Sequence, residues 1–286
     1  MAFAALPITE VDSHRKAVTT NGLRYSYLEY GSHDNPPVML LHGIWSTGAV
    51  WHDIAVQLAE THHVVSVDFR GRSHTQWSPQ GDYSTKSYVS DVLGLYKALC
   101  LEKASIIGHS MGGGVATALA AEHPGIVESL VVIDSGPVMR AGSAVEFERQ
   151  LASLSQDFPS MAAARAWQTH ALPNISKDAV ERRLDSRLVE QDGRVVWRED
   201  PVIRTSRDLI GRPSENAMWE RYLSVKTRTL FVLGRNSHLV TDEAEKRLTT
   251  GMADATSIRI DSAGHNVFED NHDDTMTAIS TFLADR

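Results

Sequence analysis

Two patterns of hydrophobic and polar positions alternate through the first half of the chain. Short apolar runs predict strands, and longer stretches with apolar residues three and four positions apart predict helices between them. Strands that alternate with helices are typical of a parallel sheet covered by helices. The predicted strands are 23–30, 38–41, 64–67, 105–107, 130–133, 229–233 and 256–260, and the predicted helices are 51–59, 87–99, 111–123, 242–248 and 273–283.

This alternation of strands and helices stops after the predicted strand 130–133 and resumes only at the predicted strand 229–233. In between, helical patterns follow one another, and prolines interrupt the chain between them. We therefore predict an α/β core formed by residues 1–138 and 227–286, with a helical cap, or lid, inserted over residues 139–226 after strand 130–133. The helical patterns of this cap cover residues 144–154, 161–170, 177–188 and 216–222.

Composition and charge place the chain among ordinary globular proteins. It has 286 residues, of which 42% are hydrophobic and 22% charged, close to the globular average. Lys and Arg number 28 against 36 Asp and Glu, and this acidic balance argues against a nucleic-acid partner. Residues 140–228 hold 15 of the basic and 13 of the acidic side chains, so we expect solvated ion pairs there.

Targeting and redox signals are few. The N-terminal residues make a poor signal peptide, and no run of about 18 apolar residues predicts a membrane span. The single cysteine, Cys100, ends an apolar helical pattern, and we expect it to be a buried small hydrophobe. We expect a cytoplasmic protein that acts on a small molecule, without nucleic-acid or membrane partners. The sequence leaves the oligomeric state open, a homodimer included.

A glycine-rich turn provides the strongest chemical signal. Gly108-His109-Ser110-Met111-Gly112 follows the predicted strand 105–107 and leads into the predicted helix 111–123. A G-x-S-x-G sequence in this context is a nucleophile elbow, which holds the serine hydroxyl at a helix N-terminus where negative charge is favoured. An ordinary serine in a glycine turn is the alternative, and both flanking elements favour the elbow.

The loop after the second predicted parallel strand offers a partner for this serine. His42-Gly43-Ile44-Trp45 follows strand 38–41, where a hydrolase with an elbow needs a backbone N–H aimed at the reacting oxygen. We predict that the N–H groups of Ile44 and Met111 form the oxyanion hole. His42 is expected only to shape the turn.

These motifs resemble those of the α/β-hydrolase superfamily over nearly the whole chain. They are His42-Gly43, Asp68-Phe69-Arg70-Gly71-Arg72-Ser73, the elbow, and Gly264-His265 before the last helix. The resemblance implies a mostly parallel sheet flanked by helices and a serine hydrolase, but no particular substrate. The serine nucleophile separates the chain from the haloalkane dehalogenases and epoxide hydrolases of this fold, which use a carboxylate.

The general base is predicted to be a histidine after the last strand. His265 follows strand 256–260 and a short turn, where it can reach the hydroxyl of Ser110. His272 is the nearest rival, and His109 is expected to pack beside the elbow.

The acid departs from the usual pattern of the family. Most members carry it after the seventh strand, and Ser237 stands at that position in this chain. A serine cannot stabilise an imidazolium by charge, so we predict that Asp134 is the acid. It follows strand 130–133, which corresponds to strand six of the resembled family. Asp242 is the alternative, and Asp134 would then only begin a turn.

The displaced acid narrows the resemblance to a subgroup. Together with Ser237-His238-Leu239-Val240 and Pro173-Asn174-Ile175, it resembles the subgroup that contains (E)-2-(acetamidomethylene)succinate hydrolase. In that enzyme lid arginines hold a dicarboxylate substrate. Here only Arg149 lies near such a position, so the resemblance implies the triad and not the substrate. Trp45 and Trp167 are further candidates for the substrate pocket.

The sequence contains neither metal-ligand spacing nor a phosphate loop, and His62-His63 point apart in a strand. We therefore predict a hydrolase without metal or cofactor that cleaves an ester, lactone or amide of a small, partly apolar substrate through an acyl-enzyme. Two alternatives remain. One is a cofactor-free dioxygenase that uses the His–Asp pair, and the other is a ligand receptor with slow turnover.

Overall fold

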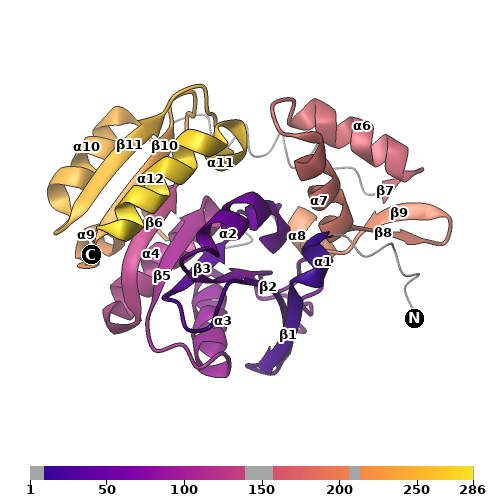
Figure 1. Cartoon of the computed structure of the whole chain (residues 1–286), viewed down its shortest axis with the longest axis horizontal. Helices are drawn as coiled ribbons and strands as arrows, with labels where there is room; N and C mark the ends of the chain where they lie inside the picture. The colour runs from indigo at the N-terminus through magenta and orange to yellow at the C-terminus, as the bar shows by residue number, and fades with distance from the viewer. Residues whose placement is uncertain (1–9, 139–156, 206–212, 286) are drawn as a thin grey trace.

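An eight-stranded sheet forms the centre of the molecule (Figure 1). The computed structural model describes residues 10–138, 157–205 and 213–285. In spatial order the strands are β1 (Arg15–Thr20), β2 (Leu23–Tyr30), β4 (His63–Val67), β3 (Pro37–Leu41), β5 (Ala104–His109), β6 (Val127–Ile133), β10 (Thr229–Gly234) and β11 (Ala255–Ile260). β1 and β2 pair antiparallel, β2 also pairs antiparallel with β4, and the strands from β4 to β11 run parallel.

The predicted fold class is confirmed, and each of the seven predicted strands is present with ends shifted by at most a few residues. The sequence analysis missed β1, which lies at the edge of the sheet. Its residues are half-buried or exposed along their whole length. An edge strand of this kind lacks the apolar alternation that identifies strands in a sequence.

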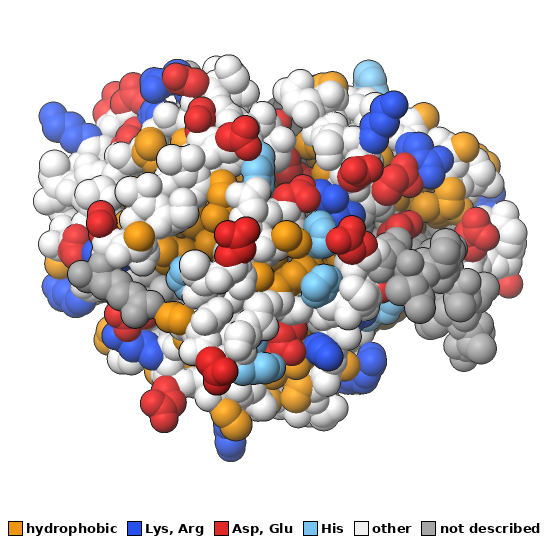
Figure 2. All heavy atoms as spheres, viewed as in Figure 1, with side chains coloured by type: hydrophobic (Ala, Val, Ile, Leu, Met, Phe, Trp, Pro, Cys, Tyr) orange, Lys and Arg blue, Asp and Glu red, His pale blue; other side chains and the backbone are white. Residues whose placement is uncertain are grey.

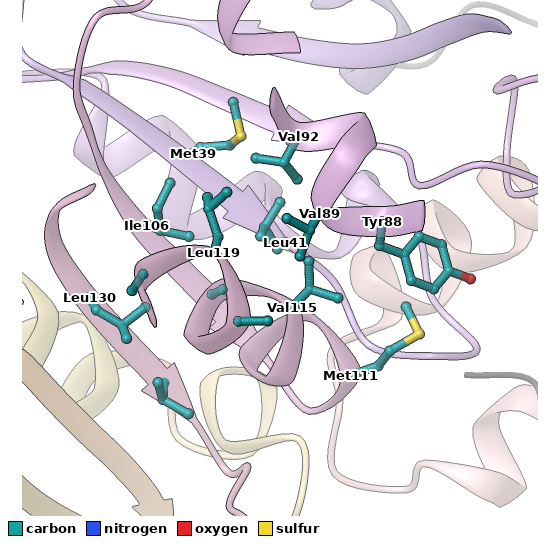
Figure 3. Close-up of a cluster of buried hydrophobic side chains, with 14 of the residues drawn as sticks. Met39, Leu41, Tyr88, Val89, Val92, Ile106, Met111, Val115, Leu119 and Leu130 are labelled. Carbon is teal, nitrogen blue, oxygen red and sulfur yellow. The ribbon is translucent and has the colours of Figure 1, made fainter. Parts of the chain in front are cut away.

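Helices cover both faces of the sheet, and none in the described part of the chain has the length and apolar character needed to cross a membrane. Side chains along β3 alternate between the two faces: Met39 and Leu41 belong to one hydrophobic cluster, Val38 and Leu40 to the other. Figure 3 shows the first cluster, with Met39 and Leu41 close to side chains of the covering helices. The helices on this face are α3 (Thr85–Ala98), α4 (Met111–Glu122), α9 (Glu215–Ser224) and α10 (Asp242–Gly251), and those on the other are α2 (His52–Leu58) and α12 (His272–Ala284).

Residues 157–205, which we call the cap segment, gather to one side of the sheet core (Figure 1). They have a hydrophobic cluster of their own that includes Phe158, Leu184 and Trp197. α9 instead contributes Trp219 to the core cluster. The division of the chain at residues 139–226 stays a prediction. The elements of the cap segment are β7 (Asp157–Phe158), α6 (Met161–Ala171), α7 (Lys177–Arg187), β8 (Leu188–Gln191), β9 (Arg194–Trp197) and α8 (Pro201–Thr205).

The cap segment contains strands as well as the helices predicted for it, and the sequence analysis did not predict these strands. β7, β9 and β8 form a three-stranded sheet, and β8 and β9 are a hairpin whose two-residue turn is Asp192-Gly193. Both turn residues have positive φ, 52° and 75°, as a type I′ hairpin turn requires. An Asp-Gly pair between two apolar runs was the available signal, and we overlooked it because helical patterns dominate the neighbouring sequence.

The prediction that Cys100 is buried is also wrong, because the residue is exposed. It has a φ of 55°, and its N–H donates to the Lys97 carbonyl at 3.3 Å while the Leu101 N–H donates to the Tyr96 carbonyl at 2.9 Å. This is a Schellman motif, which ends α3 with a left-handed residue. Cys100 therefore lies just beyond the apolar stripe of α3.

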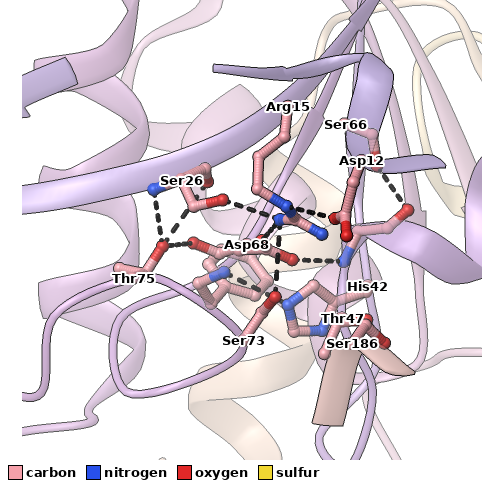
Figure 4. A network of polar contacts seen from close by, with 12 residues as sticks. Asp12, Arg15, Ser26, His42, Thr47, Ser66, Asp68, Ser73, Thr75 and Ser186 are labelled. Atoms are coloured by element: carbon pink, nitrogen blue, oxygen red, sulfur yellow. Dashed lines mark hydrogen bonds and ion pairs between the residues drawn. The ribbon is translucent and has the colours of Figure 1, made fainter. Parts of the chain in front are cut away.

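A buried carboxylate ties the antiparallel edge to the rest of the core (Figure 4). Asp68, directly after β4, is fully buried. It accepts hydrogen bonds from the Arg15 guanidinium of β1 at 2.8 Å and from the Gly48 N–H at 2.7 Å. Gly48 begins the short helix η1 (Gly48–Trp51). Arg15 also pairs with Asp12, whose side chain is more exposed than that of Asp68.

Replacing Asp68 with Ala should strongly destabilise the fold, because the Arg15 guanidinium and the Gly48 N–H both lose an acceptor. Removing one partner of a buried ion pair typically costs about 3–5 kcal/mol, and we expect a loss near the lower end in the free energy of unfolding measured with urea. The matched control Asp12→Ala removes the more exposed partner of Arg15 and should cost less than about 1 kcal/mol. Equal losses in the two variants would contradict this role for Asp68.

Candidate active site

The turn between β5 and α4 holds Ser110 in a strained backbone conformation. Its φ is 53° and its ψ is −118°, a region that residues other than glycine rarely adopt. A Cβ on Gly112 would lie 2.1 Å from the Leu41 carbonyl oxygen, and one on Gly108 would lie 2.4 Å from the Gly112 oxygen. Both glycines are therefore required for the turn. It presents the Ser110 hydroxyl at the carboxyl edge of the sheet, as the elbow sequence predicts.

Three of the predicted side chains form a continuous hydrogen-bonded line. The Nε2 atom of His265 lies 3.1 Å from the Ser110 Oγ, and its Nδ1 atom lies 2.7 Å from the Asp134 Oδ2. A carboxylate only accepts hydrogen bonds, so Nδ1 carries the proton and Nε2 accepts from the Ser110 hydroxyl. His265 lies in the loop between β11 and α11 (Val267–Asp270). The arrangement allows a proton to move from the hydroxyl to the ring.

Asp134 is buried at the end of β6. Its residue is 1% exposed, and its φ of 44° turns the chain sharply away from the sheet. Besides His265, its carboxylate accepts from the Ser237 hydroxyl at 2.6 Å and from the Gly234 N–H at 3.3 Å. These three donors compensate for the removal of a charged group from water.

Ser237 occupies the position after β10 where most members of the resembled family carry the acid. The structure brings its hydroxyl to the same carboxylate oxygen that faces His265. Its Oγ also accepts from the Leu239 N–H at 3.3 Å. The usual acid position and the displaced acid therefore converge on one point beside the imidazole. The sequence analysis treated Ser237 only as the site of a missing acid and did not foresee this contact.

The other residues considered for these roles take no part in the line of hydrogen bonds from Ser110 to Asp134. The Asp242 side chain is 91% exposed and pairs with Arg259 at 3.0 Å. His272 contacts the Gln57 amide at 2.6 Å on the surface. His109 is buried, and its Nε2 lies 2.8 Å from the His265 carbonyl oxygen. Burial holds the pKa of His109 well below its ordinary value, with the nearby His265 acting in the same direction, so the neutral ring supports the His265 loop.

His42 orients the loop that carries the predicted oxyanion donor Ile44. The Nε2 atom of His42 accepts from the Phe69 N–H at 3.1 Å, so its Nδ1 carries the proton and donates to the Gly43 carbonyl at 2.7 Å. That carbonyl belongs to the same planar trans peptide as the Ile44 N–H, and the two point in opposite directions. Burial, followed by the charge of Arg72, holds the pKa of His42 well below its ordinary value. The ring is therefore a fixed neutral donor.

Arg72 connects this loop to the elbow, and the sequence analysis did not single it out beyond its place in a family motif. Its Nε donates to the Ile44 carbonyl at 2.8 Å, and an Nη lies 3.7 Å from the Met111 sulfur. A Cβ built on Gly43 would lie 3.5 Å from the Ser110 Cβ, so the loop lies against the serine. Met111 begins α4, where backbone N–H groups have no acceptor within the helix. Both predicted oxyanion donors are thus next to Ser110.

Helix α7 of the cap segment lies against this region. Thr47 donates to the Ser186 hydroxyl at 2.8 Å, and Arg183 pairs with Glu269 of α11 with an Nε–Oε1 distance of 2.9 Å. The positive charges of Arg183 and Arg187 contribute to lowering the pKa of His42. On the face that Figure 2 shows, hydrophobic, histidine and charged side chains are mixed along the boundary between the core and the cap segment.

The ion pairs of the cap segment are only in part the solvated ones expected. Arg165 and Glu181 form an exposed pair. Arg187 and Glu199 instead have side chains that are 5% and 1% exposed, and the Arg187 guanidinium lies 4.4 Å from the centre of the Trp197 ring. Sequence spacing did not reveal this burial, because the hairpin that carries Trp197 was not predicted.

The residues predicted to line the substrate pocket lie in different parts of the structure. Trp45 is half-buried against the core cluster beside the oxyanion loop. Trp167 packs in the cap segment, with its ring 5.6 Å from that of Phe158 and 5.7 Å from that of Trp197. Arg149 lies outside the described residues.

Comparisons with known proteins identify the family to which this fold belongs. Residues 36–272 match the family described as alpha/beta hydrolase fold. The chain is 28% identical to 2-(acetamidomethylene)succinate hydrolase of Mesorhizobium japonicum over 87% of this chain and 88% of that protein. It is also 28% identical to sn-1-specific diacylglycerol lipase ABHD11 of Danio rerio over 95% and 85% of the two chains. A crystal structure of E-2-(acetamidomethylene)succinate hydrolase superposes with a TM-score of 0.85 at 26% identity, covering 94% of this chain and 98% of that one.

Asp134→Asn should lower kcat for hydrolysis of an activated ester far more than Asp242→Asn. Losing the charge behind the imidazole and its correct tautomer typically costs about 10⁴-fold, whereas Asp242 faces solvent and should change kcat by less than about twofold. Steady-state kinetics on both folded variants, with circular dichroism as a check on folding, gives the comparison. Equal losses, or a larger loss for Asp242→Asn, would reject the assignment of Asp134.

Proposed function

Because the chain belongs to the α/β-hydrolase fold family, we propose that it is a cofactor-independent serine hydrolase. It cleaves an ester, lactone or amide bond of a small, partly apolar substrate through an acyl-enzyme. The observation that carries this proposal is the unbroken line from the Ser110 hydroxyl through His265 to the Asp134 carboxylate. It supplies a nucleophile, a base and a charge in contact with one another, as acyl transfer by serine requires.

In the first step the Ser110 oxygen attacks the substrate carbonyl, and the Nε2 atom of His265 takes the hydroxyl proton. The ring becomes an imidazolium, and Asp134 stabilises this charge through the hydrogen bond at Nδ1. The carboxylate also fixes the tautomer before the reaction, so Nε2 is free to accept. Because the elbow is held by backbone sterics, the hydroxyl needs little reorientation.

The carbonyl oxygen gains negative charge as the tetrahedral intermediate forms, and the N–H groups of Ile44 and Met111 stabilise it. Hydrogen bonds from His42 to the Gly43 carbonyl and from Arg72 to the Ile44 carbonyl fix this loop before the substrate arrives. Such preorganised donors each contribute about 3 kcal/mol to lowering the barrier. The N-terminal end of α4 adds favourable dipole potential.

Collapse of the intermediate transfers the proton from His265 to the leaving alcohol or amine and leaves Ser110 acylated. Water then enters, His265 takes one of its protons, and the second tetrahedral intermediate breaks down to release the acid and restore the hydroxyl. The ring alternates between base and acid in both halves, and Asp134 remains ionised throughout.

The type of bond cleaved is proposed from the relatives, and the type of substrate from the residues beside Ser110. One relative is a hydrolase named for an acetamidomethylene compound, and another is named as a diacylglycerol lipase. The same nucleophile therefore suits either an amide or an ester. Support for a small and partly apolar substrate comes from the half-buried Trp45 and from α7, which contacts the loop beside the nucleophile.

A fluorophosphonate probe tests the nucleophile directly. We expect it to label the full-length protein once, on Ser110, and we expect Ser110→Ala to abolish both labelling and the hydrolysis of p-nitrophenyl acetate while leaving the circular dichroism spectrum unchanged. The control Ser280→Ala removes an exposed hydroxyl from α12 and should behave as the wild type. Intact mass spectrometry checks the site and the stoichiometry.

Labelling that persists in Ser110→Ala would end the proposal. Oxygen uptake with a heteroaromatic substrate, in a protein that the probe does not label, would instead support the dioxygenase alternative. A single turnover followed by a long-lived adduct would support the receptor.

A further inference from the structure

A second group of reactive side chains lies at the opposite edge of the sheet from Ser110. Glu29, His33 and His63 bring one carboxylate oxygen and two imidazole nitrogens within 4.8 Å of one another. The Nε2 of His63 lies 3.0 Å, and that of His33 3.7 Å, from the Glu29 Oε1. We propose that these three residues form a binding site for a divalent transition metal ion of the zinc type, separate from the hydrolytic site.

The spacing of the ligand atoms suits such an ion. Zinc binds imidazole nitrogen and carboxylate oxygen at about 2.0–2.2 Å, so tetrahedral ligands lie roughly 3.4 Å apart. The distances of 3.0 and 3.7 Å from the shared Glu29 oxygen bracket this value. The His33 side chain is 74% exposed, and rotation of its ring closes the remaining distance to His63. Two of the three ligands therefore need almost no movement.

The local fold explains why these residues meet. Glu29 lies on β2, which pairs antiparallel with β4, and His63 is the first residue of β4. Gly31 then turns the chain with a φ of 77°, where a Cβ would lie 2.2 Å from the His62 carbonyl oxygen. This close approach is open only to glycine, and it returns His33 to the ring of His63 at a centroid separation of 4.3 Å. The sequence analysis considered only the neighbours His62-His63 and missed the Glu29–His33 spacing.

The site is independent of the hydrolytic machinery. Ser110 follows the carboxyl end of β5, whereas His63 stands at the amino end of β4, and both strands run parallel to β3. Five strand residues separate the two edges, which is roughly 16 Å. A metal held by His33 and His63 therefore cannot contact His265 or the substrate carbonyl.

Two imidazoles and one carboxylate favour zinc, nickel, copper or cobalt over magnesium and calcium, which prefer oxygen ligands. Three protein ligands leave a fourth position for water. The ligand atoms are one carboxylate oxygen and two imidazole nitrogens, each of which binds a metal through a free lone pair. A bound metal would connect the end of β2, the loop that follows it and the start of β4.

Titration of the full-length protein with Zn²⁺ by isothermal calorimetry tests this site. We expect the wild type to bind one equivalent at pH 7.5 with micromolar or tighter affinity. His33→Ala and Glu29→Gln should each weaken binding at least tenfold. Zn²⁺ should raise the Tm of the wild type and leave that of His33→Ala unchanged.

The matched control is His62→Ala, which removes the neighbouring histidine outside the cluster and should bind Zn²⁺ as the wild type does. Because His33 is exposed, its replacement should leave the fold and the rate of ester hydrolysis intact, so this test is independent of the proposed function. Equal affinity in His33→Ala and the wild type would overturn the proposal. So would the absence of Zn²⁺ binding to the wild type at 100 µM, roughly a hundredfold above the micromolar limit stated above.

Discussion

The hydrogen bond between the buried Asp134 carboxylate and the His265 ring is the contact on which the arrangement of the site depends. It joins the end of β6 to the loop after β11, two segments that β10 separates in the sheet. The carboxylate is also held by the Gly234 N–H and the Ser237 hydroxyl after β10. Three neighbouring strand ends therefore converge on one charge, and the strained elbow presents Ser110 to the far side of the ring. A carboxylate that does not reach this point beside Nδ1 would leave the imidazole without its partner.

The oxyanion loop is fixed by a different set of buried contacts. His42 and Arg72 bind successive carbonyl groups, those of Gly43 and Ile44, and so set the orientation of two adjacent peptides. Desolvation keeps the His42 ring neutral, so the loop does not change its charge near neutral pH. Helix α7 adds positive potential from Arg183 and Arg187 in the same region. In the proposed mechanism the developing negative charge meets backbone dipoles that are oriented before the reaction, and preorganised dipoles of this kind are the largest source of stabilisation in many enzymes.

The sequence alone was sufficient to predict those residues whose position a local pattern defines. The G-x-S-x-G turn between a strand and a helix located Ser110, and a loop after the last strand located His265, because both depend on chain order. Asp134 could be reached only by elimination, since its contact with His265 spans 131 residues. The hydroxyl that Ser237 donates to it was not predictable, because a short polar residue in a loop has no periodicity. The β8–β9 hairpin, the exposed Cys100 and the pairing of His33 with His63 were missed for a related reason. Each depends on a turn residue with positive φ, which a search for periodic apolar positions does not detect.

The most direct test moves the carboxylate from the end of β6 to the loop after β10. Ser237 and Asp134 face the same point beside His265, so a carboxylate supplied from either strand end should serve the imidazole. The double variant Asp134→Asn/Ser237→Asp, compared with Asp134→Asn alone, isolates the charge from the rest of the site. We predict that kcat for an activated ester recovers at least tenfold in the double variant, with KM little changed, because the restored charge acts mainly on the transition state. A folded double variant no more active than Asp134→Asn would contradict the claim that a carboxylate at this point drives the chemistry.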